Sequence, residues 1–343
     1  MRSEAPTIQD VARVAGVSTA TVSRALTSPG RVSERTRDLV LEAVETTGYV
    51  ANEMARNLRR QRANSICVIA PELSNPFFSN IISGIEQICK PQGYGVFVTE
   101  SSSTDEEKAG LINMMASARV DGFIVLDGNL DHSMLKTRGP SGRPVPIVSA
   151  CEWRNGSLAP SVTVDNVGGA MQAVKHLAAL GHTKIGHISG PEENVLTAAR
   201  MQGYKKGLDS SGLAYREDYV LRGEFSLESG QRAAEHWLKM PDRPTAIFCA
   251  SDREAFGFIS QVSKNGVQVP RDVSVIGFDN IEVSGFFVPA LTTVSQPRVE
   301  IGRVAAKMLF DLIQENEHHT MENPQLDVSL VIRESTAPPA KQA

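Results

Sequence analysis

Residues 7–26 read TIQDVARVAGVSTATVSRAL, the pattern of two short helices joined by a tight turn. Thr7 is a good helix-capping residue, and Asp10, three positions later, completes a capping box. Gly16 ends the first helix, because glycine adopts the left-handed backbone of a helix end without strain. Ser18 then caps a second helix. A helix, a turn at glycine and a second helix at this spacing predict a helix-turn-helix.

Three helices are expected in the first 50 residues, each with an apolar stripe at helical spacing. The second helix covers Thr19–Leu26, and the third, Glu34–Thr47, begins after Ser33 and ends at Gly48. The side chains expected to face inward are Ile8, Val11, Ala12 and Ala15 from the first helix, Val22, Ala25 and Leu26 from the second, and Val40, Leu41 and Val44 from the third. No strand is expected in this segment.

The charge is unevenly distributed along the chain. The whole chain of 343 residues has a formal net charge of −4. Residues 1–62 hold ten Arg, seven acidic residues and no Lys, which gives them +3 and leaves −7 on the remainder. Arg presents a planar fork of donors that suits phosphates and base edges. A small basic segment on a larger acidic body indicates a nucleic-acid-binding module.

Residues 51–62, ANEMARNLRRQR, have helix-forming composition but little apolar surface. A helix this short and polar is marginal by itself. We therefore place a hinge helix or linker here, between an all-α headpiece at residues 1–50 and a larger domain at residues 63–343.

Strand-like apolar runs alternate with amphipathic helices from residue 66 onward, which predicts α/β lobes with doubly wound parallel sheets. A strand, a loop and a helix occur at 66–90 and again at 184–211, so two lobes are expected. The expected strands are 66–70, 95–99, 122–126, 146–149, 161–164, 184–189, 246–250, 273–278 and 326–332. The expected helices are 77–90, 106–118, 167–180, 197–211, 227–239, 254–265 and 297–314. Ligands of such sheets bind at the carboxyl ends of the strands.

The second short helix exposes small polar side chains and one Arg, a set that suits base edges and phosphates in a major groove. These residues are Thr19, Ala20, Thr21, Ser23 and Arg24. The alternative is the outer face of an ordinary three-helix bundle.

The chain closely resembles the LacI/GalR family of bacterial transcriptional regulators. In the head, the likeness rests on Asp10-Val-Ala, Ala15-Gly-Val-Ser, Thr21-Val-Ser-Arg, Gly48-Tyr and Ala55-Arg-Asn-Leu. It continues through Asn75-Pro-Phe-Phe, Val164-Asp-Asn, Val275-Ile-Gly-Phe-Asp-Asn and Pro289-Ala-Leu-Thr-Thr-Val, and covers residues 7–335. The resemblance implies a body like a periplasmic sugar-binding protein, with a small molecule between its lobes.

The resemblance also implies roles in DNA binding. Thr19 and Ala20 take the principal base-reading positions, and Arg24 makes a third contact. Ala20 offers only an apolar contact, such as one to a thymine methyl group. Leu58 matches a hinge leucine that wedges into the minor groove; the alternative is that it packs on the core. The phosphate-contacting or positioning residues are Thr7, Ser18, Thr21, Ser23, Tyr49 and Asn52.

For the effector, the resemblance implies a cleft with stacking aromatic rings and polar groups that hold the ligand. The candidate residues are Phe77, Phe78, Asp165, Arg200, Phe225, Asp252, Asp279 and Gln296. Two simpler roles stay open: Asp165 and Asp252 are caps of the helices that follow them, and Phe78 is a core residue.

Motifs of enzymes and metal sites do not occur in the sequence. It has no GxSxG, P-loop, HExxH or strand-linked GxGxxG, and its widely spaced Cys residues resemble reduced core residues. No apolar run reaches the length of a membrane span. We therefore expect no catalysis, no cofactor and no metal. We also expect a cytoplasmic protein that is nucleoid-associated when bound to DNA.

The sequence thus predicts a repressor that binds a pseudo-palindromic double-stranded operator as a homodimer and responds to a small-molecule effector. A sugar or sugar derivative is the expected effector, with a nucleobase or nucleoside as the alternative. A sugar-binding protein with no DNA role and an architectural DNA-binding protein with no ligand are the competing functional classes.

Overall fold

The computed structural model describes residues 6–49, 63–101, 120–135, 144–154, 156–314 and 323–340. Two compact units make up the chain, Met1–Gln61 and Arg62–Ala343. The expected hinge helix at 51–62 and the expected helix at 106–118 lie outside the described residues.

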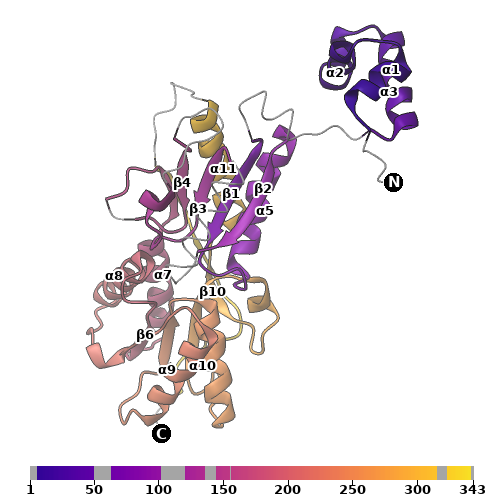
Figure 1. Ribbon diagram of the computed structural model, residues 1–343. Helices are drawn as coiled ribbons and strands as arrows, with labels where there is room; N and C mark the ends of the chain where they lie inside the picture. Colours follow the sequence, from indigo (N-terminus) through magenta and orange to yellow (C-terminus); the bar gives the residue numbers. More distant parts are fainter. Residues whose placement is uncertain are drawn as a thin grey trace. The chain divides into compact units, whose positions relative to one another are not determined.

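The described part of the first unit, residues 6–49, is a small head of three α-helices (Figure 1). Its elements are α1 (Ile8–Ala15), α2 (Thr19–Thr27), the 3₁₀ turn η1 (Pro29–Arg31) and α3 (Glu34–Thr47). Gly16 and Gly48 end α1 and α3 with φ of 67° and 63°, in the left-handed region that favours glycine. The helix-turn-helix predicted from the sequence is confirmed.

The head has its own hydrophobic core, in which Val11, Val22 and Val40 are fully buried. One inward-facing assignment is wrong: Leu41 is 46% exposed, and Ala43 is buried in its place. Ala43 lies three positions after Val40 and so shares its helix face, whereas Leu41 is turned about 100° away from that face.

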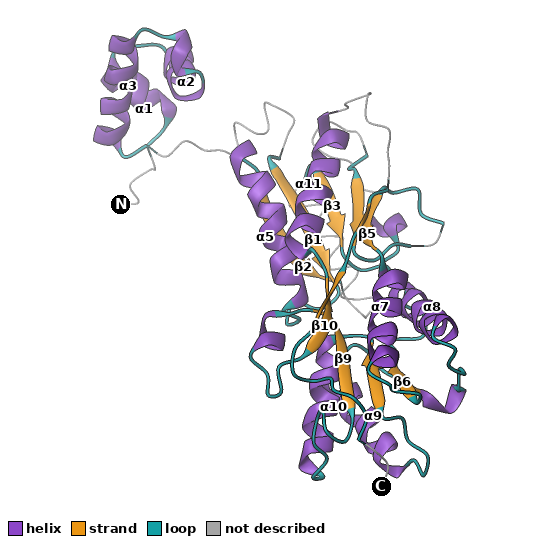
Figure 2. Cartoon of the chain, turned by 180° about the vertical axis from the view of Figure 1, so that it is seen from behind, coloured by secondary structure: helices purple, strands orange, loops and turns teal. Residues whose placement is uncertain are grey.

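The second unit holds two lobes, each built around a six-stranded sheet (Figure 2). In lobe 1 the strand order is β11-β5-β4-β3-β1-β2, and all pairs are parallel. Its strands are β1 (Ser65–Ala70), β2 (Gly95–Glu100), β3 (Gly122–Val125), β4 (Ile147–Ala150), β5 (Ser161–Val164) and β11 (Gln325–Leu326). Its described helices are α5 (Phe77–Cys89) and α11 (Arg298–Gln314), with the 3₁₀ turns η2 (Lys90–Gln92) and η3 (His132–Leu135).

In lobe 2 the strand order is β12-β10-β9-β8-β6-β7. Its strands are β6 (Ile185–Ile188), β7 (Val220–Leu221), β8 (Ala246–Cys249), β9 (Ser274–Asp279), β10 (Thr292–Ser295) and β12 (Ser329–Val331). Its helices are α7 (Asn166–Ala179), α8 (Val195–Ser210), α9 (Leu227–Lys239) and α10 (Asp252–Lys264), with the 3₁₀ turns η4 (Glu217–Tyr219) and η5 (Glu282–Gly285). Helices α7 and α8 cover one face of this sheet, and α9 and α10 cover the other (Figure 1).

The sequence prediction of two doubly wound lobes is confirmed, with three corrections to the strands. The expected strand at 326–332 is divided: β11 joins lobe 1, and β12 joins lobe 2 antiparallel to β10. The sequence predicts neither β7 nor β10. β7 has only two residues, and the polar Thr292, Thr293 and Ser295 of β10 do not form an apolar run. The chain passes between the lobes after β5, after β10 and between β11 and β12.

Candidate functional site

Helix α2 presents its first turn to solvent. The Ser18 hydroxyl accepts a hydrogen bond from the Thr21 backbone N–H at 3.1 Å, which fixes the helix start. Thr19, Ala20 and Arg24 are exposed, whereas Val22 on the opposite side is buried. The exposed face is therefore free of the packing that holds the head together.

The other head candidates lie at helix ends, within α2 or outside the described residues. The Thr7 N–H and hydroxyl both donate to Asp10 Oδ2, at 2.9 and 2.7 Å. Tyr49 is half-buried against the head core. Thr21 and Ser23 are half-buried on α2. Asn52 and Leu58 lie outside the described residues.

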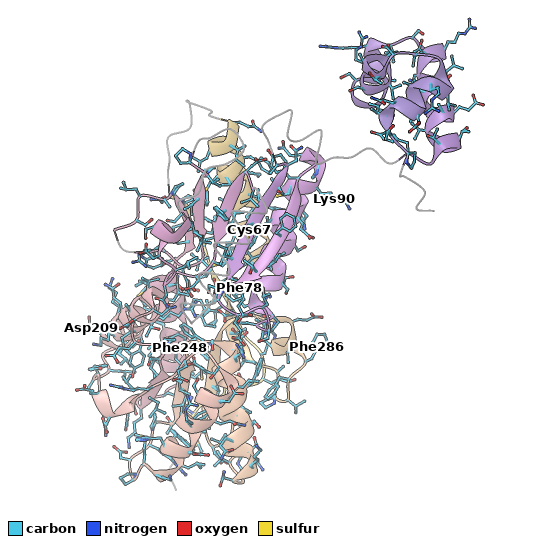
Figure 3. All side chains as sticks on the ribbon, viewed as in Figure 1. Cys67, Phe78, Lys90, Asp209, Phe248 and Phe286 are labelled. Atoms are coloured by element: carbon cyan, nitrogen blue, oxygen red, sulfur yellow. The ribbon has the colours of Figure 1, made fainter. Side chains whose placement is uncertain are left out.

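The second unit has a narrow cavity of about 50 Å³ where the lobes meet. Lobe 1 contributes Asn75, Phe77, Phe78, Cys151 and Glu152, and lobe 2 contributes Leu196, Arg200, Phe225, Ser251, Arg253 and Asp279. Figure 3 shows Phe78 at the level where the two lobes adjoin. Several of these residues directly follow a strand, as Cys151 follows β4 and Ser251 closely follows β8, so the cavity lies at the carboxyl ends of the strands.

Arg200 is the central cation of this cavity and is only 2% exposed. Its Nε donates to Asn166 Oδ1 at 3.0 Å, and its Nη2 lies 3.8 Å from Asp279 Oδ1. Its Cζ lies 3.9 Å from the ring centre of Phe278 and 5.6 Å from that of Phe225. Burial lowers the pKa of Arg200, and attraction to Asp279 opposes that change. The guanidinium is thus held in place from several sides.

Aromatic rings line the cavity from both lobes. Phe77 and Phe78, at the start of α5, pack edge to face with ring centres 5.1 Å apart. Both also belong to the hydrophobic core of the unit, so Phe78 is at once a core residue and a cavity residue. Phe225 faces them from lobe 2.

Three sequence candidates are not among the cavity residues of the described chain. Asp165 caps α7 by accepting the Gly168 N–H at 2.7 Å. Asp252 is fully buried and accepts bonds from the Ile281 N–H at 2.9 Å and the Ser284 hydroxyl at 2.6 Å, so it joins α10 to the segment after β9. It does not cap α10, because Ser251 does. Gln296 lies behind the cavity and donates to Asp279 Oδ1 at 2.7 Å.

Two charged residues of this cavity, Arg253 and Glu152, and Glu72, the partner of Arg253, were not predicted from the sequence. Arg253 of lobe 2 reaches across to Glu72 of lobe 1, with Nη2 and Oε1 3.2 Å apart. Hydrogen bonding to Arg253 lowers the pKa of Glu72. Glu152 is buried and accepts the Gly128 N–H at 2.9 Å, while burial raises its pKa. Their positions just after β1, β4 and β8 were the available signal, because strand carboxyl ends converge in such sheets.

Two kinds of feature are absent from the described ranges. They contain no cluster of three or more side chains suited to hold a metal ion. No helix within them is both long and apolar enough to cross a membrane.

The chain matches known proteins along nearly its whole length. Residues 7–52 match the model of bacterial regulatory proteins of the lacI family, and residues 174–336 match a periplasmic binding protein-like domain. The HTH-type transcriptional repressor CytR of Escherichia coli K12 is 40% identical over 334 residues, which cover 97% of this chain and 96% of that protein.

Solved structures agree with these matches. The lac repressor dimer bound to operator and the anti-inducer ONPF superposes with a TM-score of 0.84 at 29% identity, over 97% of this chain and all of that one. The complex of the transcriptional regulator CelR with cellobiose superposes with a TM-score of 0.71 at 30% identity, over 96% and 99%. The chain therefore belongs to the lacI family of bacterial regulatory proteins and is a DNA-binding transcriptional regulator.

Proposed function

We propose that this repressor reads its operator with α2 and responds to a sugar or sugar derivative bound between its lobes. The exposed Thr19, Ala20 and Arg24 meet base edges, and Thr7, Ser18, Thr21, Ser23, Tyr49 and Asn52 contact or position the phosphates. Two copies place two heads on two half-sites. Residues 1–50 are the headpiece, 51–62 the hinge with its Leu58 wedge, and 63–343 the effector and dimerisation domain. Binding to chromosomal DNA places the protein in the cytoplasm, on the nucleoid.

The observation that carries the effector proposal is the pair of opposed walls in the cavity. Phe77 and Phe78 belong to lobe 1, and Arg200, Phe225 and Asp279 belong to lobe 2. A ligand that touches both walls binds with an affinity that depends on the distance between the lobes. Such differential affinity is what couples a ligand to a change of conformation.

The size of the cavity gives the direction of that change. Small-molecule sites usually enclose about 300–1,000 Å³, whereas this cavity has about 50 Å³. A sugar therefore enters only if the walls separate, which breaks or lengthens contacts such as the one between Arg253 and Glu72. We propose no enzymatic role for the cavity, because the relatives of this chain are transcriptional regulators.

Two ligand classes fit the lining. Carboxylates and guanidinium groups, here Glu152, Asp279 and Arg200, hydrogen-bond sugar hydroxyls. CelR, similar in structure, was solved with cellobiose. The phenyl rings of Phe77, Phe78 and Phe225 favour a second candidate, a nucleobase or nucleoside whose flat ring stacks on them.

The test is a thermal-shift screen of the full chain with D-ribose, cellobiose, adenosine and uridine, followed by operator binding with each positive compound. A binder raises the melting temperature, since it stabilises the folded state by mass action, and it changes operator affinity in a fluorescence anisotropy titration. Steep salt dependence of operator binding separates a DNA-binding protein from a free sugar-binding protein. A compound that binds without changing operator affinity contradicts the proposed coupling.

A further inference from the structure

Glu254 is a fully buried carboxyl group directly behind the cavity. It is the third residue of α10, and Ser251 is the residue that caps this helix. Ser and Glu at this spacing form a capping box, in which the Glu side chain turns back to the start of its own helix. An ordinary capping role therefore predicts that Glu254 serves α10 alone.

The carboxyl of Glu254 instead reaches another element. Its Oε1 accepts the backbone N–H of Phe225 at 2.9 Å, across 29 positions of the sequence. Its Oε2 lies 3.2 Å from the Ser251 hydroxyl, and the Ser229 hydroxyl at the start of α9 lies 3.4 Å from Oε1. One buried side chain thus connects the Phe225 loop with the N-terminal ends of α9 and α10.

Phe225 needs this support, because its backbone is in the left-handed region with φ of 55°. For a bulky residue that conformation is strained, and it persists only when the surrounding structure holds it. Its ring lies so close to Gly190 that a Cβ there would be 2.2 Å from Phe225 Cζ. A Cβ on Gly223 would be 2.0 Å from Glu254 Oε1. The ring and the carboxyl therefore occupy space that two glycines leave open.

We propose that Glu254 is a positioning residue for effector binding: it holds the Phe225 backbone so that the Phe225 ring forms the lobe 2 wall of the cavity. This inference rests on the proposed function of the cavity, because it assigns Glu254 to the same site. Glu254 itself touches no ligand. It acts through Phe225, and through Ser251, which also lines the cavity.

The surroundings of Glu254 make its hold on Phe225 dependent on pH. The charged and titratable groups that act on it or are affected by it are Arg200 from α8, Asp279 from β9 and Cys249 from β8. Burial raises the pKa of Glu254 to about 8, and the bonds from Phe225 and Ser251 oppose that rise. Above this pH the carboxylate accepts both bonds more strongly, since hydrogen bonds to a charged acceptor are the stronger ones.

The test uses the full chain and two variants of similar size. E254Q keeps an acceptor for the Phe225 N–H, whereas E254M fills the space without one. E228Q, at an exposed position of α9, is the matched control. Phe residues labelled with ¹⁵N and ¹³C give NMR signals for the Phe225 amide and ring. We expect the Phe225 signals to titrate near pH 8 in the unchanged chain and in E228Q, to lose that titration in E254Q, and to shift at all pH values in E254M.

The affinity measurement uses D-ribose, cellobiose and adenosine as probes. Above pH 8, where Glu254 is charged, loss of its hydrogen bond to Phe225 weakens binding by about tenfold, so we expect that loss in E254M at high pH and a flattened pH profile in E254Q. In a Phe225→Ala background, we expect E254M and E254Q to cause no further change in probe affinity. The inference is overturned if the Glu254 variants lose the same affinity with and without the Phe225 ring. It is also overturned if the NMR signals of Phe225 are unchanged in both variants. If no probe binds, the proposed function fails, and the NMR signals still decide the role of Glu254.

Discussion

Arg200 shows how far one residue of this cavity was predictable. The family resemblance assigned it to the cleft, and the structure buries it among Asn166, Asp279 and two phenyl rings. A charge at 2% exposure is retained only where its donors are satisfied. Asp252 was assigned by the same reasoning, yet its carboxylate is occupied by η5 and β10. Both residues lie near the cavity. The hydrogen-bond partners of each side chain decide whether it lines the cavity or serves only the fold.

We expect Arg200→Ala to abolish the response to the effector while operator affinity stays within about twofold. Its guanidinium is a buried cation of the lobe 2 wall, whereas the head is a separate compact unit. The measurement is operator anisotropy with and without a compound that stabilises the unchanged chain. Arg222→Ala is the control, because the Arg222 side chain is 92% exposed. A preserved response removes Arg200 from the site.

At the scale of elements, helices cross closely where one of them lacks a side chain. Helix α11 passes α5 at Gly302, where a Cβ would be 2.0 Å from the Ile81 carbonyl oxygen. Gly84 of α5 makes the same kind of approach, with a Cβ 2.1 Å from the Val299 oxygen. Backbone atoms cannot move aside for an added Cβ as the end of a flexible side chain can. The two helices therefore lie at this distance only because both positions are glycine. This crossing lies on lobe 1, on the helix that carries the Phe77–Phe78 wall.

Gly302→Ala is expected to lower the free energy of unfolding by about 2 kcal/mol, although alanine favours helices, because it overpacks the crossing. Gly285→Ala is the matched control. Its φ is ordinary and its Cβ would have no neighbour nearer than 3.8 Å, so the change should stay within about 0.5 kcal/mol. Urea unfolding of both variants checks this, and similar values for the two would show that the crossing adapts.

The hinge segment at 51–62 lies outside the described residues, and its role stays a prediction. We expect Leu58→Ala to weaken binding to a specific operator by more than it weakens binding to random duplex. An apolar wedge contributes only where the DNA is kinked, while phosphate contacts act on any sequence. Anisotropy titrations with the two duplexes give the two losses. Losses of equal size would refute the wedge.

For the molecule as a whole, the shifted pKa values of buried groups make the free energy of unfolding depend on pH. Burial raises the pKa of Glu254 from its ordinary value of 4.5 to about 8. Between those values the folded chain keeps a proton that the unfolded chain has lost, so stability falls as pH rises. Burial raises the pKa of Asp279 as well, which acts in the same direction. Burial lowers the pKa of His187 from 6.5 to about 4, so its opposing contribution is confined to lower pH.

We therefore expect the free energy of unfolding to fall by about 1–2 kcal/mol between pH 6.5 and pH 8. E254Q should show a smaller fall over the same interval, since an amide does not titrate. Urea titrations at the two pH values measure both. A rise in stability over this interval, or an unchanged fall in E254Q, contradicts the assignment.

Removal of residues 1–62 should leave a folded domain that dimerises and keeps its effector affinity. The head buries its own cluster around Val11, Val22 and Val40, and the clusters of the two lobes include none of these residues. Gel filtration and the thermal shift with a positive compound check the prediction. An unfolded fragment would mean that the proposed boundary is wrong.

The sequence by itself determined the helix ends of the head and the apolar strands of the two lobes. Caps, glycine ends and apolar periods act over a few residues, so Ser33 and Gly48 set the bounds of α3 at Glu34–Thr47 as expected. Those same short-range signals identified the helix-turn-helix and the alternation of strands and helices. The roles that we propose for Thr19, Arg24 and Arg200 come from the family resemblance.

Only the tertiary structure decided which polar residues meet at the cavity. It divided residues 325–331 between two sheets, turned Asp252 away to η5 and β10, and brought Glu254 against Phe225. These outcomes depend on contacts between residues far apart in the sequence, such as Arg253 with Glu72 at a separation of 181 positions. A capping pattern or a period of 3.6 carries no information at that range, because it fixes which face a residue takes and not what that face meets.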